Sequence, residues 1–96
     1  MTDSRPMLVF FSSAQSGPSR RMESLVAHIA RKERHRLHVI QADVDKDVGL
    51  VERLAVQDAP ALVLVVKNKI VARLDGRASA PKIAAMLESH LEPVPA

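Results

Sequence analysis

Short apolar runs alternate with helically spaced apolar residues along this chain, a pattern typical of strands joined by helices. The first run, Met7–Phe11, is continuous and of strand length. Pro18 and Ser19 suit the first turn of a following helix, because a proline there gives up no N–H group that the helix needs. The apolar stripe of this helix has the spacing i, i+3, i+4, i+7 and i+8, and it consists of Met22, Leu25, Val26, Ile29 and Ala30.

The next segment predicts a second strand and a short helix. Leu37–Ala42 reads as the strand, since Val39 and Ile40 are β-branched. The short helix can be capped by one of three aspartates, Asp43, Asp45 or Asp47. Its apolar positions are Val48, Val51, Leu54 and Ala55.

The second half of the chain predicts a β-hairpin. Ala61–Val66 is the most continuous apolar run in the sequence. A tight turn at Lys67–Lys69 leads from it into Ile70–Leu74, so we expect these two strands to pair antiparallel. Gly76 then breaks the strand pattern.

A last helix should close the fold. Ser79 is its predicted cap and Pro81 lies in its first turn. Its apolar face consists of Ile83, Met86, Leu87 and Leu91, and we expect Pro93 and Pro95 to end the ordered chain. The element order β-α-β-α-β-β-α predicts an α/β fold, a four-stranded mixed sheet with helices on both faces. We expect residues 1–96 to form a single domain with an ordered core at about 7–91.

Composition excludes several classes of protein. The chain has no cysteine, so disulfides, thiolate metal sites and thiol catalysis are excluded for it. It has no uncharged apolar stretch of about 18 residues that could span a membrane. Met1–Pro6 also lacks the apolar core of a signal peptide. We therefore expect a cytoplasmic protein that does not contact membranes.

The charge balance is basic. The net charge is +3 and nine of the fourteen basic residues are arginines, which permits contact with nucleic acid or with an acidic surface. The only aromatic residues, Phe10 and Phe11, fall in a predicted buried strand, so none remains to stack on bases. The densest basic run, Arg31–Arg36, suits a solvated helix end. We expect no nucleic-acid partner.

The motif Ser16-Gly17-Pro18-Ser19 stands between the first strand and the first helix. In the same frame, Cys-Gly-Pro-Cys marks the thioredoxins, and the chain resembles that family over residues 7–91. The resemblance is strengthened by three further segments in the same order: Asp43-Val44-Asp45, Ala59-Pro60 and Gly76. It implies the thioredoxin-like fold, in agreement with the fold expected from the apolar pattern.

The resemblance also implies a groove for an extended protein or peptide segment. Pro60 corresponds to the cis-proline of the family. The main chain of Ala59, just before it, would pair with the bound segment by strand addition. The other residues implied to line this groove are Gln15, Gly17, Pro18, Gly76 and Arg77.

The sequence departs from the family where the redox chemistry would be supported. Gln15 stands where the family usually has tryptophan, and Ser24 stands where it has the proline of the first helix. Phe10 occupies the position of the buried acid that assists proton transfer. Gln41 occupies the position of the lysine partner of that acid. The proton-handling residues are therefore absent together with the thiols.

Ser16 and Ser19 occupy the redox-cysteine positions, and a serine hydroxyl can neither form a disulfide nor act as a thiolate. The chain as written is therefore not a dithiol oxidoreductase. His28 lies roughly 15 Å along the helix from Ser16, too far to activate it as a hydrolytic nucleophile. The histidines lack metal-ligand spacing, and the run Asp43–Asp47 lacks the glycine and glutamate that an EF-hand requires. We expect no metal and no cofactor.

Two interpretations stay open. In the first, the chain is a naturally redox-inactive thioredoxin-like scaffold that binds a protein segment, which the divergence at Phe10, Gln15 and Gln41 favours. In the second, it is a Cys-to-Ser variant of a small thiol-disulfide oxidoreductase of redox homeostasis, a thioredoxin-type disulfide reductase. The intact Gly17-Pro18 centre favours the second. The native codons for residues 16 and 19 distinguish the two.

Overall fold

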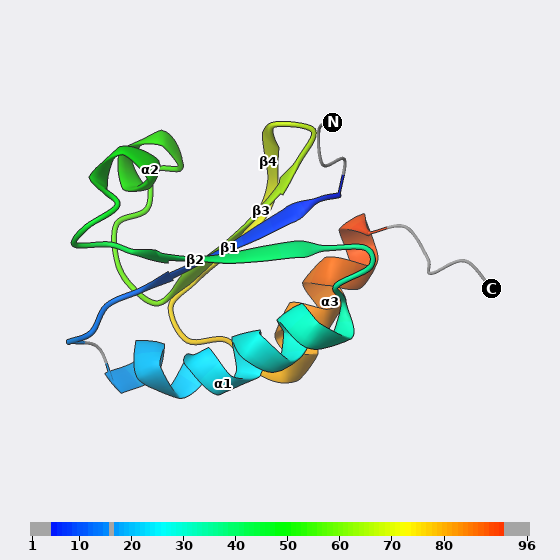
Figure 1. Cartoon of the computed structure of the whole chain (residues 1–96), viewed down its shortest axis with the longest axis horizontal. Coiled ribbons are helices and arrows are strands. Elements are labelled where there is room, and N and C mark those ends of the chain that lie inside the picture. Colours follow the sequence, from blue (N-terminus) through cyan, green and yellow to red (C-terminus); the bar gives the residue numbers. More distant parts are fainter. Residues whose placement is uncertain (1–4, 16, 92–96) are drawn as a thin grey trace.

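The computed structural model describes residues 5–15 and 17–91. Its elements, in chain order, are β1 (Met7–Ser12), α1 (Gly17–Lys32), β2 (His38–Asp43), α2 (Val48–Arg53), β3 (Ala61–Val66), β4 (Lys69–Asp75) and α3 (Ala80–His90). The four strands form one sheet in the order β2-β1-β3-β4 (Figure 1). β1 runs parallel to β2 and antiparallel to β3, and β3 and β4 form an antiparallel hairpin. The predicted mixed sheet is confirmed.

The alternation of side chains along β1 divides the core into two layers. Leu8 and Phe10 face α1 and α3, which cover one side of the sheet. Val9 and Phe11 face the opposite side, which α2 and its flanking turns cover (Figure 1). All four side chains are completely buried, because β1 is an inner strand with both faces covered. The prediction of helices on both faces is confirmed.

The turn of the hairpin and the start of the last helix are both set by local features that the sequence predicts. Lys67 and Asn68 both have positive φ, 52° and 65°, as a two-residue turn between right-twisted strands requires. Ser79 accepts a hydrogen bond from the N–H of Lys82 at 3.4 Å and so caps α3, with Pro81 in the first turn. The predicted apolar face of α3 is confirmed, since Ile83 and Leu87 are buried.

Two sequence-based predictions were wrong in detail. β2 begins at His38 rather than Leu37, because the N–H of Leu37 bonds to the carbonyl of Glu33 at 2.9 Å and closes the turn after α1. Asp47 precedes α2 but its side chain caps no N–H of that helix. Its carboxylate accepts the N–H of Asp43 at 2.8 Å instead. Side-chain turn bonds of this kind compete with helix capping for the same carboxylate.

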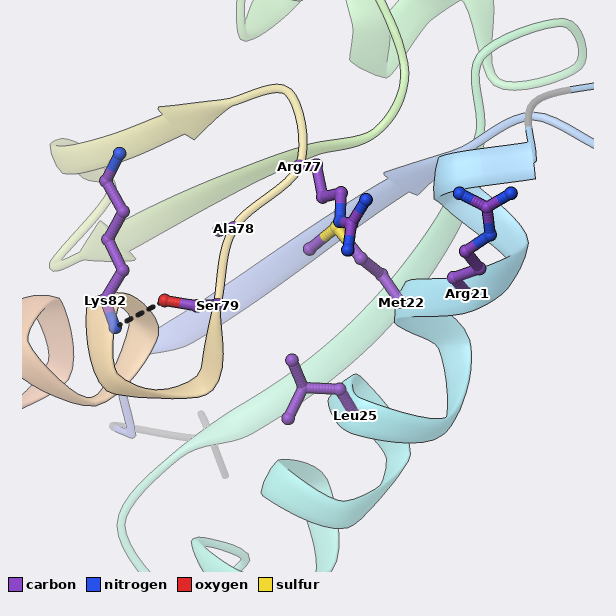
Figure 2. A pocket seen from close by; sticks show the side chains of 7 residues that line it. All are labelled: Arg21, Met22, Leu25, Arg77, Ala78, Ser79 and Lys82. Carbon is purple, nitrogen blue, oxygen red and sulfur yellow. Dashed lines mark hydrogen bonds between the residues drawn. The ribbon is translucent and has the colours of Figure 1, made fainter.

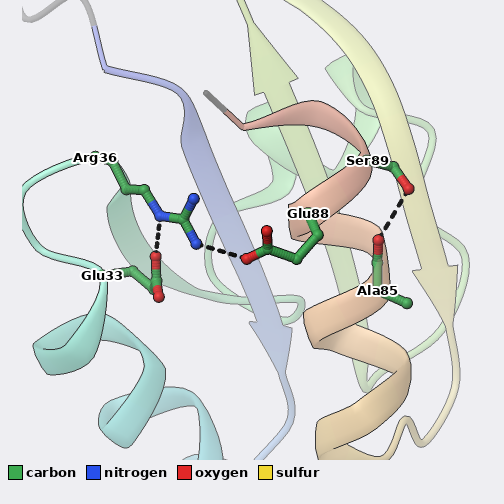
Figure 3. A network of polar contacts seen from close by, with 5 residues as sticks. All are labelled: Glu33, Arg36, Ala85, Glu88 and Ser89. Atoms are coloured by element: carbon green, nitrogen blue, oxygen red, sulfur yellow. Dashed lines mark hydrogen bonds and ion pairs between the residues drawn. The ribbon is translucent and has the colours of Figure 1, made fainter. Parts of the chain in front are cut away.

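The basic run after α1 is only partly a solvated helix end. Arg31 and Lys32 are exposed, as predicted. Arg36 instead bonds to Glu33 in its own turn and to Glu88 on α3, at 2.8 Å for the latter (Figure 3). These two carboxylates, that of Glu33 foremost, raise the pKa of Arg36. The contact links α1 to α3 on the side of the molecule where both helices end.

No helix in the described part of the chain is long and apolar enough to cross a membrane. The expected end of order at Pro93 and Pro95 lies outside the described residues.

Candidate functional site

Three connections of the chain come together at one end of the sheet. Phe11 of β1 pairs with Ala61 at the start of β3, and Ala61 also pairs with Asp75 at the end of β4. The segments that follow β1, precede β3 and follow β4 therefore emerge from the same end. These are the three segments that the sequence predicted to line a groove.

Pro60 lies at the centre of this end of the sheet. The Ala59–Pro60 peptide bond is cis and Pro60 is buried. Its carbonyl accepts a hydrogen bond from the N–H of Gly76 at 2.8 Å, which ties the segment before β3 to the segment after β4. Gly76 has φ +82°, a conformation that favours glycine. The structure thus joins Pro60 and Gly76 directly.

Ala59 presents main-chain groups that nothing else uses. It is half-buried, and within residues 5–15 and 17–91 neither its N–H nor its C=O has a hydrogen-bond partner. A main-chain donor and acceptor without a partner are the groups with which an added strand pairs. Within the described residues, the main-chain N–H and C=O of Ala59 are therefore not used by another part of the chain.

The segment after β1 carries the other predicted groove residues. Gln15 and Gly17 are exposed and Pro18 is half-buried at the start of α1. Ser19 is completely enclosed, so its side chain is not part of an open surface. Ser16 lies outside the described residues. Gln15, Gly17 and Pro18 are thus accessible at the same end of the sheet as Ala59 and Pro60.

The two positions at which the family resemblance implies proton-transfer residues, 10 and 41, carry no ionisable side chain. Phe10, which the resemblance places where the family has a buried acid, is completely buried in the apolar layer beneath α1 and α3. Gln41 is exposed, and its Nε2 donates to Oγ of Ser12 at 3.0 Å. This contact joins the ends of β1 and β2 through neutral groups. No proton donor or acceptor of carboxylate type is present at either position.

A cavity that the sequence did not predict as a unit opens beside Gly76. Its volume is about 520 Å³, and its walls come from α1 and from the connection into α3 (Figure 2). We call it the basic pocket, lined by Arg21, Met22, Leu25, Arg77, Ala78, Ser79 and Lys82. Of these residues, the sequence predicts only Arg77 as a site residue, whereas Met22 and Leu25 are predicted as helix core positions and Ser79 as a helix cap. The sequence does place cations in the early turns of two helices, which could have indicated a basic site. Arg21 and Lys82 are too far apart in the chain, however, for a sequence pattern to predict that they lie close together.

The described residues hold no group of three or more histidine and carboxylate side chains placed to bind a metal ion. Asp43 and Asp47 are occupied in turn bonds to main-chain N–H groups. The carboxylates of this run therefore have a local structural role.

A four-stranded mixed sheet, a cis-proline just before β3 and a helix that begins after β1 at the same end of the sheet define a thioredoxin-like protein, here without thiols. The chain belongs to the thioredoxin family: the family model described as Thioredoxin matches residues 1–89.

Named relatives agree with this family. A thioredoxin-like protein of Synechocystis sp. is 31% identical over 88 residues, covering 92% of this chain and 81% of that protein. Among solved structures, the germline-specific thioredoxin Deadhead of Drosophila melanogaster superposes with a TM-score of 0.84 at 32% identity, covering 92% of this chain and 83% of the other. A thioredoxin of Fasciola hepatica has a TM-score of 0.83 at 24% identity, covering 92% and 83% of the two chains, which is a likeness of fold alone.

Proposed function

We propose that this chain uses the thioredoxin fold as a scaffold that binds an extended protein segment, without exchanging disulfides. The observation that carries the proposal is the open main-chain N–H and C=O of Ala59 beside the buried cis-proline. Strand addition needs no particular side chain on the receiving strand, so it can persist when the thiols are gone. Gln15, Gly17, Pro18, Gly76 and Arg77 are the proposed borders of this groove.

Disulfide exchange is ruled out for the chain by elementary chemistry. Exchange requires a thiolate that attacks and a second thiol that resolves the mixed disulfide. The chain supplies neither. Phe10 and Gln41 leave no proton-handling pair behind the loop, which supports a scaffold over a disabled enzyme.

The second candidate function is thiol-disulfide exchange: the chain would be a variant of a disulfide reductase in which Ser16 and Ser19 replace cysteines. A specific observation favours it: the Gly17-Pro18 centre remains at the start of α1, and a helix start is where a thiol is most easily ionised. In that case the groove would serve the same extended segment as a substrate rather than as a partner.

The groove is tested by selecting binders from a random peptide library displayed on phage and titrating the strongest peptide into isotope-labelled protein. We expect the amide signals of Gly17, Ala59 and Gly76 to shift together. The matched control is the same peptide with its main-chain N–H groups methylated, which removes donors but keeps side chains and should bind much more weakly. Failure to select any binder, or shifts confined to Arg31–Arg36, would overturn the proposal.

A further inference from the structure

The basic pocket continues the proposed groove without a break. Arg77 follows Gly76, whose N–H is bonded to the carbonyl of Pro60. Arg77 then forms part of the pocket wall, with Arg21 on α1 opposite (Figure 2). A second cavity, lined by Gly17, Arg20, Arg21 and Glu23, adjoins it at Arg21. A segment that pairs with Ala59 can therefore extend into the basic pocket.

Three cations at the pocket have no carboxylate partner in the described part of the chain. Arg21, Arg77 and Lys82 are exposed, and none of them takes part in an ion pair with residues 5–15 or 17–91. By contrast, Arg36 and Arg73 are each paired with a carboxylate. Neither α1 nor α3 has an acidic residue in its first turn to offset these charges. The pocket is thus a concentrated positive surface.

The floor of the pocket is apolar. Met22 and Ala78 are buried and Leu25 is half-buried, and Arg21 and Arg77 form the rim on either side of Met22, with Lys82 farther along the wall (Figure 2). A volume of about 520 Å³ accommodates several side chains of a peptide. Neither a phenylalanine nor a histidine lines the pocket, so it offers no ring to stack on a nucleobase. The rim and floor together fit a segment with carboxylate and aliphatic side chains.

We propose that the basic pocket selects protein segments rich in aspartate and glutamate, with aliphatic residues between them, as the partners of the groove. This inference rests on the groove function proposed above and names its partner class. Carboxylates of the segment pair with Arg21, Arg77 and Lys82, while its aliphatic side chains cover Met22 and Leu25. Complementary charge of this kind raises the association rate and discriminates between partners.

The test uses the same phage library and isolates the effect of charge. Binders selected by the unaltered protein should be enriched in aspartate and glutamate. The charge-reversal variant Arg77→Glu/Lys82→Glu should lose this enrichment and bind a selected acidic peptide about tenfold more weakly. Arg53→Glu, an exposed cation of α2 on the opposite side of the sheet, is the matched control and should leave the affinity unchanged. Affinity should also fall as salt rises, through screening.

The experiment distinguishes an error in the assigned partner class from an error in the proposed groove itself. Binders that shift Ala59 but show no acidic enrichment would overturn the pocket assignment and leave the groove intact. So would an acidic peptide that Arg77→Glu/Lys82→Glu binds as well as the unaltered protein does. A library that yields no binder at Ala59 would overturn both. If a low concentration of a single-stranded oligonucleotide displaced the acidic peptide, the pocket would be a nucleic-acid site and the inference would be wrong.

Discussion

Phe10 lies in the middle of β1, where it packs beneath α1 and α3 with no exposed surface. A carboxylate at this place would have to be buried among apolar side chains, which strongly raises its pKa and suits it to proton transfer. Phenylalanine instead adds a large apolar side chain to the core. The side chain at position 10 therefore contributes to core packing, whereas the family resemblance implies a carboxyl group that transfers protons there.

This residue predicts how far redox activity can be restored. In the variant Ser16→Cys/Ser19→Cys, the start of α1 should lower the pKa of a cysteine thiol, but no acid stands behind the loop to move protons. We expect insulin reduction with dithiothreitol to be at least about tenfold slower than for a thioredoxin that carries the acid. The unaltered chain is the control and should give only the uncatalysed rate. A variant as fast as that thioredoxin would favour the disabled-enzyme interpretation.

Arg21 and Lys82 show why part of the site could not be predicted residue by residue. Each reads from the sequence as an ordinary solvated cation on a helix. They share a pocket only because α1 and α3 pack side by side on the same face of the sheet. Pro60 and Gly76 are different, because the cis peptide bond before Pro60 and the φ of +82° at Gly76 restrict the residue type at each.

At the scale of elements, the strands and long helices follow directly from periodicity. The continuous run Ala61–Val66 and the stripe from Met22 to Ile29 each carry enough apolar side chains to fix both type and face. The short helix α2 is different, since the structure buries none of its residues 48–53. Its ends depend on turn bonds and on Arg73, which donates to the carbonyl of Ala55 at 3.1 Å. Such long-range capping leaves no local pattern in the sequence.

The start of α3 matters for the site because the same turn holds the wall of the basic pocket. Removing the cap with Ser79→Ala should lower the free energy of unfolding by about 1 kcal/mol, measured by urea denaturation. Ser79→Asp should retain most of the stability, because a carboxylate also accepts the N–H of Lys82.

A matched control for this cap lies at the other end of α3. The hydroxyl of Ser89 bonds only to the carbonyl of Ala85 within the helix, so Ser89→Ala should change stability by less than about 0.5 kcal/mol. Equal effects of Ser79→Ala and Ser89→Ala would contradict the assigned cap.

For the whole molecule, the sheet topology gives the proposed groove a main-chain basis that does not require redox chemistry. The end of β1, the start of β3 and the end of β4 lie at the same end of the sheet. The hydrogen bond between Gly76 and Pro60 joins two of the connecting segments there. These features are set by main-chain pairing and by a core buried on both faces. Ser19 takes part in none of these strand pairings. The thioredoxin-like fold is therefore present in a chain that has no thiols.

The molecule also divides its charge unevenly around that groove. Arg21, Arg77 and Lys82 lie on the side of α1 and α3, whereas Asp58 and Asp75 line a cavity on the other side of the segment before β3. Asp75 is paired with Arg73, whereas Asp58 has no ion-pair partner in the described part of the chain, so the uncompensated charges on the two sides have opposite signs. Under the proposed function, this arrangement would favour one direction and an acidic composition in a bound segment.

Hydrogen exchange at the amide of Ala59 tests the central claim most directly, because strand addition must use this N–H if it occurs. In the free protein the amide has no partner within the described residues and should exchange rapidly. With a saturating selected peptide, we predict that its exchange slows by about tenfold or more. An unchanged rate at Ala59, while the peptide is demonstrably bound, would contradict the proposal that the chain binds extended segments by adding a strand.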